Sequence, residues 1–348
     1  MKTGSITRTA AICAFLALAC FCLCASAPAP TRVDMKNVPT IHAALWLKVN
    51  DHPQTALEGP AFDVNGNLYF VDVEGGGKVF KIRMADKTIH TIYDDPKHTG
   101  FASVKIHKDG RLFLCGFQSG DIVVIRPDGK LVEVIKTVYS GRQLIPDDMI
   151  FDREGNIYFS SYEGDNKNPK GGIYRMDAVT KTITLLSNRV GNANGVSLSP
   201  DGKTLWVAET LATQTVQKFD LEKGEKVDGQ MIPSVVYRFV PHQGWPDSNT
   251  VDMAGNLYQA MAETGRVVVL SPQGAGIAKI VIPQEFGGGY QRTYNLAFQP
   301  GTNIGFITAS GKNGGAIFTF QAPACGWPLF SHQQTGGKMP ECHLSGSN

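Results

Sequence analysis

Four oxygen-bearing side chains occupy one repeated position along this chain. Glycines recur at intervals of about 44 to 53 residues, at Gly66, Gly110, Gly155, Gly202 and Gly255. The residues eight positions before them are Glu58, Ala102, Asp147, Asn194 and Asp247. If every repeat folds alike, these side chains lie at one level of the structure and can converge. Carboxylate and amide oxygens are the ligands that Ca²⁺ and Mg²⁺ prefer, so the pattern predicts a site for a hard divalent cation.

Turn formation is the alternative explanation for these residues. Asp and Asn are common in turns because their side chains hydrogen-bond to nearby backbone groups. Glu58 is not explained in this way, since Glu has no special role in turns. A glutamate and two aspartates held together would also repel each other strongly without a cation. Four matching positions in five repeats therefore favour the metal site.

The elements that must position these residues are short strands. Residues 61–70 form two apolar segments around an Asn-Gly pair, the strongest short signal for a β-hairpin. Residues 79–82 and 88–92 supply a third and a fourth strand, which together make one propeller blade. A blade period of about 45 residues returns six times if the less regular Pro300-Gly301-Thr302 turn is included. The sequence thus predicts an all-β, six-bladed β-propeller over residues 40–323.

The sixth repeat lacks a strand. It offers three clear strands before residue 321, whereas residues 41–49 read as a strand that belongs to no blade. We expect this N-terminal strand to complete the last blade, because an open sheet edge would otherwise remain.

The N-terminus has the layout of a secretory signal peptide. Lys2 and Arg8 precede an apolar stretch that is short for a membrane span, and Ala25-Ser26-Ala27 follows it. Residues 1–27 are therefore predicted to be removed, residues 28–39 to be a linker, and the mature chain to be secreted or periplasmic without a membrane span. A lipoprotein processed at Cys20 and an uncleaved anchor remain alternatives.

Composition narrows the possible partners. The formal net charge is +2 and charged residues make up 18% of the chain, which gives no reason to expect nucleic acid or an anionic membrane as a partner. We expect a monomer that acts on a small molecule.

Three of the seven cysteines lie beyond the leader. Cys115 sits in an apolar strand and is expected to be buried. Cys325 and Cys342 lie in the predicted tail, residues 324–348. In an exported protein they are expected to form a disulfide, which would stabilise the fold by about 3 kcal/mol. Two free thiols in the tail are the alternative.

Other catalytic motifs are absent from the sequence. There is no His-Glu-x-x-His or Walker motif, and the segment Gly195–Ser199 lacks the last glycine of a nucleophile elbow. His242, five residues before Asp247, is a candidate substrate contact, with a solvated loop histidine as the alternative. Asp148, next to Asp147, is a second candidate substrate contact.

Several stretches resemble the family of gluconolactonase, senescence marker protein (regucalcin) and luciferin-regenerating enzyme. They are similar in particular to the bacterial drug-responsive lactonases, at residues 146–152, 168–174, 193–196, 246–248 and 265–270. The resemblance implies a divalent cation, usually Ca²⁺, on the propeller axis, with Mg²⁺ or another divalent cation as the alternative. Its ligands in the family match Glu58, Asn194 and Asp247. Asp147 and Ser248 match further metal-site residues of the drug-responsive group.

The resemblance also implies a chemistry. The family counterpart of Asp247 is regarded as the catalytic acid/base, so we expect a calcium-dependent hydrolase that opens lactone rings. A second calcium site known in the drug-responsive group is not expected, because Gln118-Ser119-Gly120 is short and Tyr139 replaces an acidic ligand. A non-catalytic calcium-containing propeller and an ester or organophosphate hydrolase are the alternatives.

Overall fold

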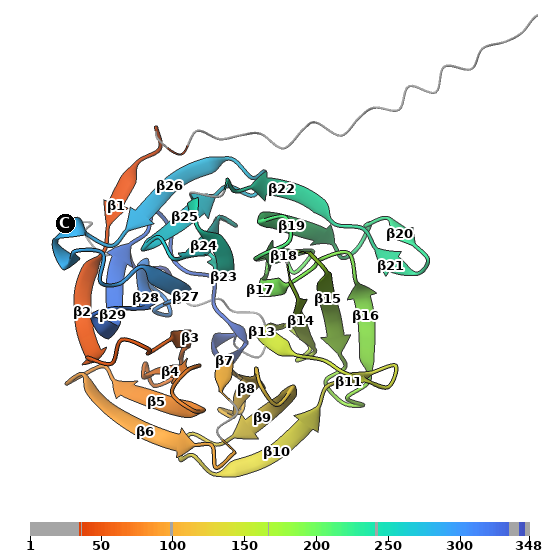
Figure 1. Cartoon of the computed structure of the whole chain (residues 1–348), viewed down its shortest axis with the longest axis horizontal. Coiled ribbons are helices and arrows are strands. Elements are labelled where there is room, and N and C mark those ends of the chain that lie inside the picture. The colour runs from red at the N-terminus through yellow and green to blue at the C-terminus, as the bar shows by residue number, and fades with distance from the viewer. Residues whose placement is uncertain are drawn as a thin grey trace, which may run out of the picture.

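The structure is a ring of six β-sheets around a central axis (Figure 1). The computed structural model describes residues 35, 37–97, 100–165, 167–240, 243–333 and 341–344. Five sheets have four strands and one has five, and the innermost strand of each sheet contacts those of the two neighbouring sheets. The predicted six-bladed, all-β propeller is confirmed.

The blades follow one another along the chain. Blade one contains β3 (Leu57–Phe62), β4 (Leu68–Asp72), β5 (Lys78–Arg83) and β6 (Thr88–Asp94). Blade two contains β7 (Phe101–Ile106), β8 (Leu112–Gly116), β9 (Asp121–Ile125) and β10 (Leu131–Lys136). Blade three contains β13 (Pro146–Phe151), β14 (Ile157–Gly164), β15 (Pro169–Met176) and β16 (Ile183–Ser187).

The second half of the ring repeats this order. Blade four contains β17 (Ala193–Leu198), β18 (Thr204–Glu209), β19 (Thr215–Asp220) and β22 (Ser234–Arg238). Blade five contains β23 (Trp245–Val251), β24 (Leu257–Ala262), β25 (Arg266–Leu270) and β26 (Gly276–Val281). Blade six contains β27 (Arg292–Phe298), β28 (Ile304–Gly311) and β29 (Gly314–Gln321). Among the described residues, two hairpins and two 3₁₀ helices lie outside the blades. They are β11 (Val138–Tyr139) with β12 (Arg142–Gln143), β20 (Lys226–Val227) with β21 (Gln230–Met231), η2 (Gln284–Phe286) and η3 (Phe330–His332).

The N-terminal segment closes the ring in two steps. β2 (Ala44–Asn50) pairs antiparallel with β29 and becomes the fourth strand of blade six, which confirms the predicted closure. The single strand predicted over residues 41–49 is wrong, because β1 (Thr40–His42) instead adds a parallel strand to β26 of blade five. Ala43 lies between them, is 2% exposed and donates its N–H to Val281 O at 2.9 Å. This small buried residue marks where the chain passes from one blade to the next.

One hydrophobic cluster fills each interface between neighbouring blades. The cluster between blades one and two, for example, joins Tyr69 and Val71 to Val104 and Leu114. Burying a side chain of this size contributes about 1.5–3 kcal/mol. The six interfaces therefore hold the inner strands at fixed positions around the axis.

All inner strands begin at one end of the axis, which we call the entry end, and finish at the turn end. In blade one the turn after β3 places Gly66 at a φ of +80°, and its N–H donates to Asp63 O at 2.9 Å. Such a positive φ favours glycine. Because this turn recurs after the inner strands, its glycine marks the same structural position in successive blades.

The three cysteines among the described residues are arranged as predicted. Cys325 and Cys342 form a disulfide with a Cα–Cα distance of 5.8 Å, and Cys115 is a buried free thiol. The predicted signal peptide lies outside the described residues. Within the described part of the chain, no helix is long and apolar enough to cross a membrane.

Candidate functional site

The entry end of the axis gathers the repeated position from all six blades. Counting four residues back from the last residue of each inner strand gives Glu58, Ala102, Asp147, Asn194, Asp247 and Tyr294. All six line one cavity of about 380 Å³. The structure therefore brings together the four polar residues that the repeat phase predicted, and it adds Tyr294 from blade six.

A β-bulge changes the direction in which each of these side chains points. The register between the first two strands shifts between Glu58 and Ala61 in blade one, and blades two to six shift at the corresponding place. A bulge bends its strand and turns a side chain away from the regular alternation of faces. The site is thus a product of the same local irregularity in every repeat.

Two glycines let the inner strands approach each other beside the site. Gly59 has a φ of +55°, and a Cβ there would lie 2.5 Å from the backbone N of Val104. A Cβ on Gly195 would lie 2.5 Å from the carbonyl oxygen of Asp247. Each glycine directly follows a polar site residue, so close strand packing and the site share the same short segments.

The donor atoms suit a hard cation. Glu58, Asp147, Asn194 and Asp247 are each 5–8% exposed and offer only oxygens as ligands. Asn194 Oδ1 is buried without a hydrogen-bond partner, and an orphaned buried oxygen is rare unless something else satisfies it. Among the described residues, no three His, Cys, Asp or Glu side chains are grouped closely enough to hold a metal by themselves. A cation here would therefore use the amide oxygen of Asn194 beside the carboxylates.

Burial and mutual repulsion hold the carboxylates partly protonated in the cation-free protein. Burial raises the pKa of Glu58 and Asp147 well above the ordinary value, and the nearby Asp247 raises both further. Burial also raises the pKa of Asp247 to about 8, although the Ser248 N–H, at 2.9 Å from Asp247 Oδ1, opposes the shift. A bound cation would favour the charged forms and reverse these shifts.

Comparison with known proteins places this chain in a protein family. A family model described as "SMP-30/Gluconolactonase/LRE-like region" matches residues 57–289. The chain belongs to this family. The lactonase drp35 of Staphylococcus haemolyticus (strain JCSC1435) is 36% identical over 310 residues, which cover 86% of this chain and 94% of that protein. The lactonase drp35 of Staphylococcus saprophyticus is 37% identical over 304 residues, with coverages of 85% and 92%.

Solved structures share the fold. A gluconolactonase from Xanthomonas campestris superposes with a TM-score of 0.61 at 23% identity, covering 78% of this chain and 87% of that chain. The calcium-binding protein regucalcin from Agrobacterium tumefaciens superposes with a TM-score of 0.66 at 15% identity, covering 87% and 98%. At these identities the two likenesses support the propeller fold alone.

The other three residues predicted for the site are Ser248, Asp148 and His242. Ser248 is 1% exposed and directly follows Asp247, but it does not line the cavity. Asp148 is fully buried below the cavity, where its Oδ1 lies 2.8 Å from Lys105 Nζ and accepts a hydrogen bond from Ser103 Oγ. The structure therefore does not bring Asp148 to the cavity as a substrate contact. His242 lies outside the described residues.

Sequence reasoning missed the walls of the cavity. Phe117, Tyr162, Leu211, Trp245 and Tyr294 line it together with the site residues. Burial, followed by the charge of Asp147, raises the pKa of Tyr162, so its hydroxyl stays protonated. Tyr294 could have been found by counting from the end of its strand, but no repeat signal marks the others.

The shifted pKa values predict a pH-dependent effect of calcium on stability. A raised carboxyl pKa stabilises the cation-free fold at low pH, and this stability is lost as pH rises through the folded-state pKa, about 8 for Asp247. Ca²⁺ binds the charged carboxylates, so it should stabilise the protein more as pH rises. We expect the Ca²⁺-induced increase in melting temperature to be roughly twice as large at pH 8 as at pH 5, measured on metal-stripped protein. An increase of equal size at both pH values would contradict the assignment of these carboxylates to the cation site.

Proposed function

We propose that this protein is a calcium-dependent lactonase that works at the entry end of the propeller. The observation that carries the proposal is the convergence of Glu58, Asp147, Asn194 and Asp247 on one cavity. The lactonases that are 36% and 37% identical to this chain support the reaction class. Lactone opening is the hydrolysis of a cyclic carboxylic ester, in which water adds to the carbonyl carbon.

Different residues would bind the cation and transfer the proton. Glu58 and Asn194 would hold the cation and Asp147 would add negative charge beside it, whereas Ser248 would act through its N–H, which donates to Asp247 Oδ1. A bound Ca²⁺ supplies Lewis-acid polarisation of a carbonyl oxygen and stabilises the negative charge that develops on it. Asp247 takes a proton from the attacking water at its carboxylate and later returns it to the leaving alkoxide. Because the charge of Asp247 raises the pKa of both Glu58 and Asp147, ionisation of one of these carboxyl groups opposes ionisation of the others.

Export is part of the proposal. The Cys325–Cys342 disulfide is of the kind that persists in an oxidising compartment, whereas cytosolic thiols are mostly kept reduced. It supports a secreted or periplasmic location, in line with the signal peptide predicted for residues 1–27. Localising the tagged full-length chain by cell fractionation would test this, and retention in the cytosol would contradict it.

The cavity walls define the charge of the substrate. None of the described residues that line the cavity is Lys, Arg or His, whereas Glu74 and Glu263 lie in its walls. Trp245 is 40% exposed and, with Phe117 and Tyr162, offers apolar surface beside the carboxylates. An anionic substrate would be repelled, and a neutral lactone with an apolar body fits this lining best.

A substrate screen tests the reaction and this selectivity together. The mature protein should hydrolyse a neutral lactone in the presence of Ca²⁺ and lose that activity when the cation is removed. The same ring carrying a carboxylate should show a kcat/KM lower by about fivefold or more, because one like charge at this range costs on the order of 1 kcal/mol. Hydrolysis of linear esters or phosphotriesters, but not lactones, would replace the lactonase assignment. Calcium binding without any hydrolysis would favour a non-catalytic propeller.

A further inference from the structure

The chain does not end with blade six but continues across the turn end of the ring. We call residues 325–333 the tail strap. It begins against blades five and six, where Met253 N donates to Cys325 O at 2.8 Å, and Gly326 N donates to Thr302 O at 3.0 Å. Trp327 N then donates to Val251 O at 3.0 Å. These backbone hydrogen bonds attach the start of the strap to two blades.

The strap then reaches the other four blades. The Phe330 ring lies 5.2 Å from that of Phe151 in blade three and 5.0 Å from that of His107 in the turn of blade two. His332 Nε2 lies 3.0 Å from Asp63 O in blade one. Leu329 packs against the cluster that contains Leu198 of blade four. One short segment therefore packs against residues or hydrophobic clusters from all six blades, and Figure 1 shows a C-terminal segment at the centre of the ring.

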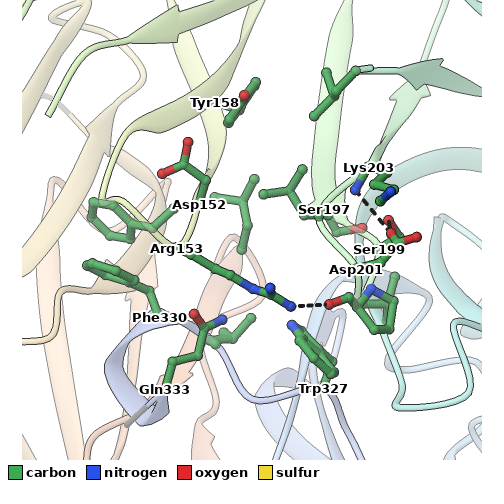
Figure 2. A pocket seen from close by; sticks show the side chains of 18 of the residues that line it. Asp152, Arg153, Tyr158, Ser197, Ser199, Asp201, Lys203, Trp327, Phe330 and Gln333 are labelled. Carbon is green, nitrogen blue, oxygen red and sulfur yellow. Dashed lines mark hydrogen bonds between the residues drawn. The ribbon is translucent and has the colours of Figure 1, made fainter. Parts of the chain in front are cut away.

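A pocket under the strap shows how it joins separate blades. Its volume is about 270 Å³, and Trp327, Phe330 and Gln333 of the strap form part of its wall. Figure 2 shows these side chains facing Arg153 of blade three and Ser199, Asp201 and Lys203 of blade four. Arg153 Nη2 donates to Pro200 O at 2.9 Å, so blades three and four are also linked directly here.

The polar residues between the strap and the candidate site are shielded from solvent. Ser103, Lys105, Ser197 and Asn249 lie on inner strands and are 0–7% exposed. They pair with each other or with neighbours around the axis, as Ser197 Oγ does with Asn249 Oδ1 at 2.6 Å. The strap thus forms a floor at the turn end, opposite the cavity at the entry end.

The disulfide ties this floor to blade six. Cys325 opens the strap, and its partner Cys342 precedes His343, whose N–H donates to Gly301 O at 2.8 Å. His343 also forms an isolated parallel bridge with Thr302. Apart from the three-residue helix η3, the strap has no helix or strand of its own. A cross-link that removes alternative conformations therefore contributes much to its position.

We infer that the tail strap is a thiol-sensitive clasp that closes the turn end of the propeller and holds its six blades together. A small dithiol would reduce the Cys325–Cys342 bond by exchange, giving two cysteine thiols and the cyclic disulfide of the reductant. The strap would then leave the turn end more often, and Phe330 would leave the apolar cluster between blades two and three. Cys115 belongs to that cluster and reports its opening, because it is a buried free thiol.

The test measures alkylation of Cys115 by a small maleimide, followed by peptide mass spectrometry. In the mature, oxidised protein we expect slow labelling. In the folded protein reduced with dithiothreitol, and in the Cys325→Ser/Cys342→Ser variant, we expect labelling at least about tenfold faster and melting several degrees lower. Phe330→Ala with the disulfide intact should also speed labelling. Val179→Ala, at a position that is 88% exposed, is the matched control and should label like the unaltered protein.

Each other outcome is decisive. Labelling of Cys115 within twofold of the oxidised protein after reduction would show that the disulfide does not control the strap, even if the double variant fails to fold. If labelling were fast only in Phe330→Ala, the strap would still cover the turn end, but its position would not depend on the disulfide. None of these measurements depends on catalysis, so they test the clasp independently of the proposed lactonase activity.

Discussion

Replacing Asp247 with Asn is expected to lower turnover by roughly 10²-fold or more while the protein still binds calcium. The change keeps an oxygen at the same position of β23 but removes the group that accepts the proton, and lost general acid–base help has effects of this size. Calcium affinity should also fall, because the change removes a charge from a buried site, but Glu58 and Asn194 remain and binding should be complete at saturating calcium. Turnover is measured on the best neutral lactone from the screen, and calcium binding is measured by titration calorimetry on the same sample.

The control for this variant is Asp201→Asn. Asp201 is an exposed aspartate at the turn end, so the same chemical change there should alter turnover by less than about twofold. Near-normal turnover of Asp247→Asn with the cation bound would rule out Asp247 as the proton carrier. It would favour hydrolysis without a protein base.

The phase of the repeats could be read from the sequence because it depends on local turns. Gly66, Gly155 and Gly255 all follow an inner strand, and each sits at a positive φ. The distance from such a glycine back to the entry end stays constant, so Glu58, Asp147, Asn194 and Asp247 could be aligned from the sequence alone. Tyr294 was missed because the glycine of the turn after β27 lies one position earlier in its turn than in the other blades, which puts Gly301 seven residues after Tyr294 instead of eight.

Contacts between repeats could not be predicted in the same way. Asp148 resembled a second site residue by its position, yet it is paired with Lys105 of another blade. The division of the N-terminal strand at Ala43 depends on two sheet edges that exist only in the closed ring. The tail follows no repeat at all, so its two cysteines indicated a cross-link but not the path of residues 325–333 across the turn end.

Replacing Glu58 with Gln is expected to weaken calcium binding by about tenfold or more, and excess calcium should restore much of the rate. Gln keeps the size and one carbonyl oxygen of the side chain but removes a negative charge from a buried site, where charge interactions are weakly screened. Turnover should therefore fall at low calcium and recover at saturation, unlike the loss in Asp247→Asn, which no amount of calcium should repair.

A substitution of a second glutamate in the same cavity distinguishes loss of a calcium ligand from loss of negative charge alone. Glu74 lines the cavity but is exposed, so Glu74→Gln removes the same charge without touching the group of buried oxygens. We expect its calcium affinity to change by less than about threefold, because solvent screens an exposed charge. If both variants weakened calcium binding equally, Glu58 would act only through the overall field of the cavity. If Glu58→Gln alone lost affinity but stayed inactive at saturating calcium, Glu58 would take part in the reaction itself rather than only in holding the cation.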